Sequence, residues 1–243
     1  MTSFTHDSRS LAETYDRVSD LQFEGGKRLV ERLGLTQGER VLDVGCGTGR
    51  LAHWIAGRVG MMGAVTGIDP LEERIHIARS RGGNARFEVG QAEDLRAFED
   101  ASFDAVCMSS VLHWVTDKAK ALAEVRRVLR PGGRLGVTTR PQELSRAGTL
   151  GQVLETLIAR APYAGRIDRS MFTFAMRACT TTDLVSLVLE SRLDLVELHV
   201  TQGARTYASG EAVVDFMEAS AFGTFLRPDA SLNGCKRGGE GGT

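Results

Sequence analysis

The stretch Val41-Leu-Asp-Val-Gly-Cys-Gly-Thr-Gly49 decides the fold of this chain. An apolar run ends in the acid Asp43, and glycines follow at alternate positions. This pattern predicts a buried strand that breaks into a tight loop, because glycine takes unusual backbone angles and lets a ligand touch the main chain. Apolar residues then recur at helical spacing, so the loop opens a helix whose free N–H groups favour a carboxylate or phosphate. We expect a small molecule to bind here.

The spacing of the glycines narrows the choice of ligand. A dinucleotide fingerprint has the form G-x-G-x-x-G. Counted from Gly45, its last glycine position is occupied by Arg50, so this chain does not match the fingerprint. A second apolar segment, Ala64–Asp69, predicts a buried strand that ends in a carboxylate. Such an acid can accept hydrogen bonds from both ribose hydroxyls of a nucleoside. Asp69 therefore indicates a nucleoside, but it suits a nicotinamide cofactor as well.

Five segments in order resemble the motifs of the class I S-adenosylmethionine-dependent methyltransferases, in particular the small-molecule enzymes of the ubiquinone/menaquinone-biosynthesis type. They are Asp43–Gly49, Ala64–Asp69, Arg86–Leu95, Ser102–Trp114 and Leu129–Val137. The resemblance covers residues 40 to 140 and implies S-adenosyl-L-methionine as the cofactor. It also implies an α/β fold, Rossmann-like and doubly wound, with a mostly parallel seven-stranded sheet, an antiparallel edge pair and a helical N-terminal cap.

The same resemblance implies a set of cofactor-binding residues. The two loop glycines would let the backbone meet the methionine end, Asp69 would hold the ribose, and Leu71 would help cover the adenine. The family often has Asp where this chain has Gln91, whose amide can accept from the adenine amino group and can donate as well. The implied set comprises Tyr15, Asp43, Gly45, Cys46, Gly47, Asp69, Pro70, Gln91, Ala92, Glu93 and Ser109.

His113 and Trp114, which follow the fourth predicted strand, are candidates for the substrate pocket. His113 is placed to act as a catalytic base, since the ordinary pKa of histidine suits proton transfer near neutral pH. The alternative is that His113 only shapes the pocket for the methyl group, with Trp114 as its wall. The sequence leaves both open. No metal ligand set is expected.

The chain divides into four parts by pattern. Residues 1–36 predict a helical N-terminal cap, in which a helix over residues 9–34 carries the Tyr15-Asp16 pair. Residues 37–140 predict the cofactor-binding core, with strands near 40–45, 63–69, 85–90, 103–109 and 133–139. Residues 141–226 predict substrate-side helices and the last strands of the same domain, and residues 227–243 predict a disordered tail.

The substrate-side part carries its own predictions. Helices are expected over residues 144–160, 182–191 and 209–221, and a loop or short helix over residues 163–176. Residues 193–201 and 204–208 would form the antiparallel pair of strands.

Composition excludes several classes of protein. The 30 basic and 31 acidic residues nearly balance, so no global field favours nucleic acid or an anionic membrane. The four cysteines lie far apart, which argues against a zinc site or a disulfide framework and favours a cytoplasmic protein. No run reaches membrane-spanning length. The oligomeric state, monomer or homodimer, is left open.

These patterns favour an enzyme that methylates a small-molecule acceptor at O, C or N by in-line displacement. Three alternatives remain: a thiol-dependent methyltransferase of the arsenite type, a nicotinamide oxidoreductase, and a regulatory protein that binds S-adenosylmethionine without turnover. The accepting molecule is not readable, because specificity resides in segments without recognisable motifs.

Overall fold

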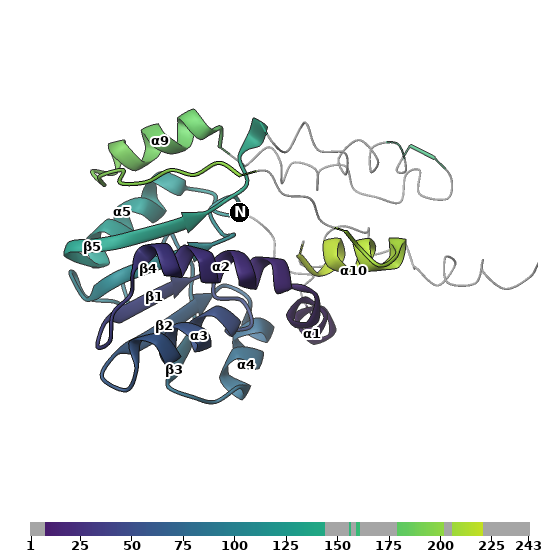
Figure 1. The fold of residues 1–243 in the computed structure, drawn as a ribbon, viewed down its shortest axis with the longest axis horizontal. Helices are drawn as coiled ribbons and strands as arrows, with labels where there is room; N and C mark the ends of the chain where they lie inside the picture. Colours follow the sequence, from purple (N-terminus) through teal and green to yellow (C-terminus); the bar gives the residue numbers. More distant parts are fainter. Residues whose placement is uncertain (1–7, 144–155, 157–158, 161–178, 202–205, 221–243) are drawn as a thin grey trace, which may run out of the picture.

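The structure is a computed structural model that describes residues 8–143, 156, 159–160, 179–201 and 206–220. Its centre is a parallel sheet of β1 (Arg40–Val44), β2 (Ala64–Asp69), β3 (Ala85–Val89), β4 (Phe103–Ser109) and β5 (Leu129–Thr138). The strand order is β3-β2-β1-β4-β5 (Figure 1). Strands β2 and β3 are added on one side of β1, and β4 and β5 on the other side, so the order reverses between β1 and β4. Ligands of such open sheets bind beyond the carboxyl ends of the strands at this reversal point.

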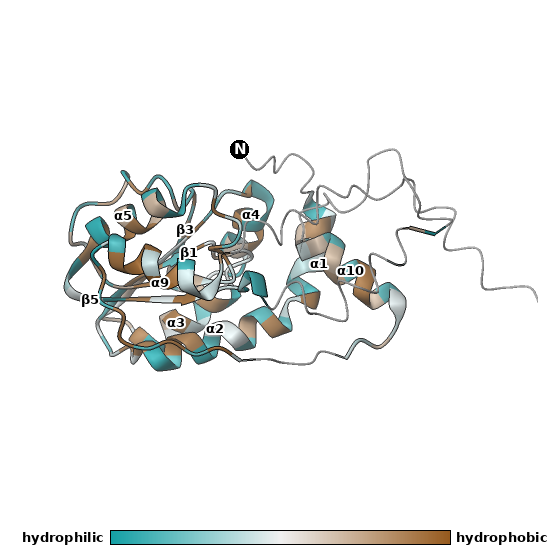
Figure 2. Cartoon of the chain, turned by 90° about the horizontal axis from the view of Figure 1, so that it is seen from above, coloured by the Kyte–Doolittle hydropathy of each residue, from teal (hydrophilic) through white to brown (hydrophobic). Residues whose placement is uncertain are grey.

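Alternate residues of the strands build a separate core on each face of the sheet. Val41 and Cys107 pack with α2 (Asp20–Leu33), α3 (Arg50–Val59) and α4 (Glu72–Ser80). Leu42 and Val106 pack with α5 (Lys118–Val128) and α9 (Thr181–Glu190). The central strands β1 and β4 are buried on both faces, as is typical of a parallel sheet covered by helices on both sides. Figure 2 shows the apolar faces of the helices in brown.

The helical character predicted for residues 9–34 is confirmed, but the structure has two helices there instead of one. The first, α1 (Arg9–Val18), ends at Ser19, and α2 starts directly after it. Helix α2 ends at Gly34, whose φ of 60° is the left-handed conformation common after helix C-termini. Helix α1 lies beside α10 (Gly210–Ser220), at the end of the molecule away from α5 (Figures 1 and 2).

Two later helices are also confirmed. The expected helix over residues 182–191 is α9, which begins with a capping box between Thr180 and Asp183. The expected helix over residues 209–221 is α10, and the Ser209 hydroxyl accepts a hydrogen bond from the Ala212 N–H at 3.3 Å. The predictions for residues 144–160, 163–176 and 227–243 lie outside the described residues, apart from Thr156, Ala159 and Arg160.

The prediction for the fifth strand was wrong about its start. The strand begins at Leu129, paired with Phe103, and the next pair is Arg134 with Ala105. Residues 130–133 therefore bulge out of the ladder, with Gly132 at φ 76°. A turn was expected between the helix that ends near residue 128 and this strand. The turn lies inside the strand instead, because Leu129 already pairs with Phe103 before the chain turns.

A strand over residues 193–201 was also expected, and the described residues form none there. Of the expected partner strand over residues 204–208, residues 206–208 are described and form no strand either, while residues 204 and 205 lie outside the described part. Within that part the sheet has five parallel strands. No described helix is both long and apolar enough to cross a membrane.

Candidate functional site

The loop after β1 folds tightly through its glycines. Gly45 and Gly47 have φ of 72° and 54°. The N–H groups of Gly45 and Cys46 both donate to the Ile68 carbonyl, at 2.7 and 2.9 Å, so the loop is tied to the end of β2. A Cβ at position 45 would lie 2.3 Å from Val111 Cγ2, which leaves no room for any side chain.

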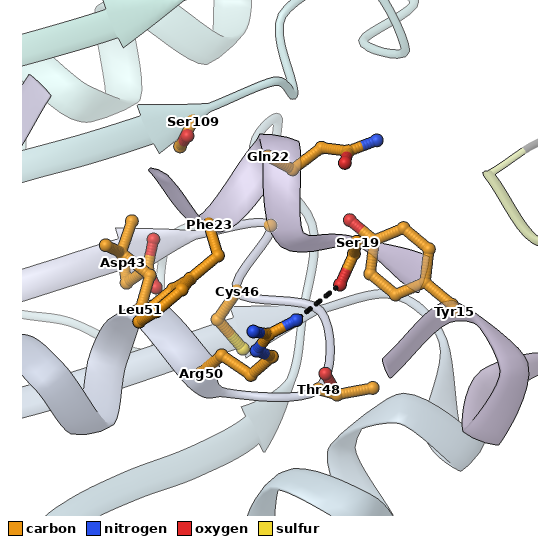
Figure 3. Close-up of a pocket in the computed structure, with 11 residues that line it drawn as sticks. Tyr15, Ser19, Gln22, Phe23, Asp43, Cys46, Thr48, Arg50, Leu51 and Ser109 are labelled. Carbon is orange, nitrogen blue, oxygen red and sulfur yellow. Dashed lines mark hydrogen bonds between the residues drawn. The ribbon is translucent and has the colours of Figure 1, made fainter. Parts of the chain in front are cut away.

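A pocket of roughly 400 Å³, part of it open to solvent, lies between this loop and helices α1 and α2 (Figure 3). It brings together five of the predicted residues, namely Tyr15, Asp43, Gly45, Cys46 and Ser109. It also contains six residues that sequence reasoning did not single out, namely Ser19, Gln22, Phe23, Thr48, Arg50 and Leu51. The ends of β1 and β4 meet the N-terminal helices in this pocket.

Asp43 is the buried acid of the pocket. It is 1% exposed, and its Oδ2 has no hydrogen-bond partner in the described part of the chain. Burial, aided by the carboxylate of Asp69, raises the pKa of Asp43 to about 7. A buried carboxylate of this kind is stabilised by a ligand that brings a positive charge or hydrogen-bond donors.

The raised pKa of Asp43 predicts a pH-dependent stability of the ligand-free protein. Because the folded state holds this proton more tightly than the unfolded chain, the stabilisation is complete below about pH 4 and is lost as pH rises through 7. Between pH 5 and 8 we expect the free energy of unfolding to fall by about 2 kcal/mol more in the wild type than in Asp43→Asn. Urea denaturation at several pH values measures this difference. Parallel curves for the two proteins would contradict it.

Asp69, at the end of β2, is hydrogen-bonded to the glycine loop that follows β1. Its Oδ2 accepts from the Gly47 N–H and its Oδ1 from the Leu71 N–H, both at 3.0 Å. The carboxyl is 6% exposed, and burial raises its pKa while the charge of Arg74 opposes that rise. Asp69 thus organises the glycine loop.

Helix α1 closes over the loop through two neighbouring side chains. Tyr15 lies against Gly47, where a Cβ would be 3.3 Å from its ring, and Arg74 stacks on the ring at 3.9 Å from the centroid. Asp16 accepts from the Thr48 hydroxyl at 2.5 Å and pairs with Arg81. Burial raises the pKa of the Tyr15 phenol. We call this set of contacts between Asp16, Thr48 and Arg81 the α1 latch.

The α1 latch predicts that Asp16→Ala loosens α1 without disturbing the sheet. A hydrogen bond to a charged group contributes about 1.5–3 kcal/mol, so the amides of residues 11–18 should exchange at least about tenfold faster. Hydrogen-exchange mass spectrometry measures this, with the β1 amides as an internal reference. Asp20→Ala is the matched control, because the Asp20 side chain is 75% exposed and pairs only at the surface with Arg50. Equal exchange in the two variants would show that the α1 latch contributes nothing.

The predicted adenine-side residues lie on neighbouring loop tips outside the pocket described above. Gln91 is exposed after β3, and Ala92 is 5% exposed. The Glu93 carboxylate accepts from the Thr116 N–H at 3.0 Å, which gives it a structural task between two loops. Pro70 is exposed beside Asp69. The roles of these residues toward a ligand stay predictions.

His113 is buried beyond the end of β4, next to Trp114. It is 7% exposed, and its Nδ1 lies 3.2 Å from the Thr139 hydroxyl. The expectation that its pKa suits proton transfer near neutral pH is wrong: burial, with the charges of Arg140 and Lys118, lowers it to about 3. The ring is therefore uncharged at neutral pH and is a weak base.

The comparisons with known proteins agree with this geometry. The family described as "Methyltransferase domain" matches residues 42–137, which run from β1 through β5. Residues 42–137 are a class I S-adenosylmethionine-dependent methyltransferase domain. The first motif of this domain is the glycine loop, and the end of its fourth strand carries Ser109. S-adenosylmethionine is the cofactor of such domains.

Relatives of the methyltransferase domain include enzymes of different specificity. The ubiquinone/menaquinone biosynthesis C-methyltransferase UbiE of Idiomarina loihiensis is 37% identical over 158 residues, which cover 60% of this chain and 62% of that protein. The O-methyltransferase cnsE of Penicillium expansum is 41% identical over 121 residues, covering 45% and 42%. The chain thus matches about half the length of these curated relatives.

A solved structure supports the fold of the methyltransferase domain. A SAM-dependent methyltransferase from Aquifex aeolicus superimposes with a TM-score of 0.57 at 20% identity, covering 76% of this chain and 87% of that one. At this identity the likeness concerns the fold alone.

The pocket fits the amino-acid end of S-adenosylmethionine. The unpartnered Oδ2 of Asp43 matches a cationic ligand, and the glycine loop lies at the N-terminal side of α3. A helix N-terminus favours a carboxylate. The pocket thus offers complementary groups to both charges of an amino acid.

Proposed function

We propose that this chain is a methyltransferase that transfers the methyl group of S-adenosylmethionine to a small-molecule acceptor. The observation that carries the proposal is the meeting of Asp43, the glycine loop and Ser109 in one pocket at the reversal point of the sheet. The relatives act on carbon and on oxygen, so the accepting atom stays open.

The proposed cofactor site extends along the carboxyl ends of four strands. Gly45, Cys46, Gly47 and Tyr15 would surround the methionine end, with Ser109 at the tip of β4. Asp69 would hold the ribose after releasing the Gly47 N–H, while Pro70, Gln91, Ala92 and Glu93 would line the adenine. This assignment is supported by the resemblance of the motifs and by the common sheet edge on which the residues lie.

The mechanism needs little chemistry from the side chains. When bound, the cofactor supplies an electrophilic methyl group on a positively charged sulfur. The chain holds the reactants close together and excludes water, and Tyr15 and the α1 latch cover the loop for this purpose. Neither a covalent nucleophile nor a metal is needed for this displacement, and no group of metal-binding side chains occurs among the described residues.

His113 is proposed as the residue nearest the acceptor. Because its ring is neutral and held by Thr139, it would orient the acceptor by one hydrogen bond, with Trp114 as a wall. A general base with so low a pKa gives little help to an acceptor that needs deprotonation. Shaping of the pocket is therefore the role that the geometry favours for His113.

The finer architecture is proposed along the same lines. Residues 1–36 would be a cap, because α1 packs on α4 and α10 and its Asp16 binds the loop. Residues 37–140 would be the cofactor-binding core, and residues 141–226 would be the substrate-side part of the same domain. The buried free thiols of Cys46 and Cys107 support a reducing, cytoplasmic location.

A stability shift separates this function from the nicotinamide alternative. A ligand at 100 times its dissociation constant adds about 2.7 kcal/mol to the free energy of unfolding. We expect a rise in melting temperature with S-adenosylhomocysteine, the product form of the cofactor, and none with NAD⁺. The opposite pattern would refute the proposed function.

A further inference from the structure

Gln22 stands out among the polar residues of the pocket. It lies in the first turn of α2, and its side-chain Oε1 is buried without a hydrogen-bond partner in the described part of the chain. It lines the same pocket as Asp43, whose Oδ2 is also buried and unpartnered (Figure 3). A buried acceptor without a partner lowers the free energy of unfolding by about 1–3 kcal/mol. A glutamine at position 22 is therefore not explained by the stability of the fold.

The neighbours of Gln22 do not supply the missing donor. Arg50 already donates to the Asp16 carbonyl, to the Ser19 hydroxyl and to Asp20. The next side chain along α2, Phe23, stacks on the Arg50 guanidinium at 4.7 Å. Gln22 and Asp43 thus both line one pocket, and each has a side-chain oxygen without a hydrogen-bond partner in the described part of the chain.

Gln22 and Asp43 both offer oxygen acceptors, so they suit a part of the cofactor that carries hydrogen-bond donors. The hydroxyls and amino group of the nucleoside are proposed to lie at Asp69 and Gln91, outside this pocket. The amino-acid end carries an ammonium group with three N–H donors and a positive charge, which suits a carboxylate and an amide oxygen together. We infer that Gln22 is a specificity-determining residue that accepts a hydrogen bond from the ammonium group of the bound cofactor. This inference rests on the proposed function.

Two ligands that differ in the amino-acid end test the inference. S-adenosylhomocysteine carries the ammonium group, and 5′-methylthioadenosine lacks the whole amino-acid end. In calorimetric titrations, Gln22→Met should bind S-adenosylhomocysteine at least about tenfold more weakly than the wild type, and 5′-methylthioadenosine equally well. Gln37→Met is the matched control, because Gln37 is exposed in the turn before β1, and it should bind both ligands as the wild type does.

The outcomes separate a ligand contact from a structural role. Because methionine removes an unpaired acceptor, the melting temperature of ligand-free Gln22→Met should equal or exceed that of the wild type. A lower melting temperature, an equal loss of affinity for both ligands, or no loss for either would overturn the inference. If the wild type binds neither ligand, the proposed function itself fails, and this result is distinct from a failure in the variant alone.

Discussion

Asp69→Ala is expected to weaken the binding of S-adenosylhomocysteine at least about 100-fold. The carboxylate has two tasks: it holds the Gly47 and Leu71 N–H groups in the ligand-free chain, and it is proposed to accept the ribose hydroxyls in the complex. Hydrogen bonds to a charged group contribute about 1.5–3 kcal/mol each, so the loss of two exceeds 2.7 kcal/mol, the free energy of a 100-fold change. Isothermal titration calorimetry measures the affinity.

Two controls make this result specific. Asp194→Ala removes an exposed carboxylate on the segment after α9 and should leave the affinity unchanged. Asp69→Asn keeps the size of the side chain and one acceptor oxygen, so its affinity should lie between those of Asp69→Ala and the wild type. An Asp69→Ala protein that binds within threefold of the wild type would remove Asp69 from the site.

Gly45→Ala is expected to lower the free energy of unfolding by about 2–4 kcal/mol. The left-handed φ of 72° costs an alanine about 1 kcal/mol, and its Cβ would meet Val111 Cγ2 at 2.3 Å, an overpacking that costs about 1–3 kcal/mol more. Urea denaturation measures the change. The same substitution should abolish cofactor binding, because the loop and Val111 cannot both keep their positions.

Gly34→Ala separates the two contributions. Gly34 has a similar φ of 60°, and nothing lies within 4 Å of the position that a Cβ would take. We expect a loss of only about 1 kcal/mol in this variant. In a Val111→Ala background, Gly45→Ala should regain part of its stability. If Gly34→Ala and Gly45→Ala lower the free energy of unfolding equally, the contact with Val111 does not contribute to the effect.

The central motif was predictable because its physical requirements are local. A strand with Asp43 as its last residue but one, followed by three glycines at alternate positions, specifies a tight loop, and all three glycines have positive φ. The parallel order followed from the alternation of apolar runs with helical periods. Strand boundaries agreed to within one residue for four of the five strands, because the turn signals lie next to the strand ends.

The missed features depend on tertiary contacts. Asp16 was expected only as part of a Tyr-Asp pair, and its partners Thr48 and Arg81 are more than thirty residues away. Gln22 carries no local signal, since its place in the pocket follows from how α2 packs on the sheet. The pKa of His113 depends on burial and on two cations that lie in other segments. The start of β5 was misjudged because Pro131 and Gly132 signal a turn even within a bulged strand.

We propose that S-adenosylmethionine binds at the edge of the sheet formed by the glycine loop and the strand ends. Calorimetric titration of the full chain with S-adenosylhomocysteine is the decisive measurement. We expect a saturable heat of binding with one site per chain, lost in Asp69→Ala. A chain that is folded by circular dichroism and gives no heat of binding up to millimolar ligand would show that this edge does not bind the cofactor.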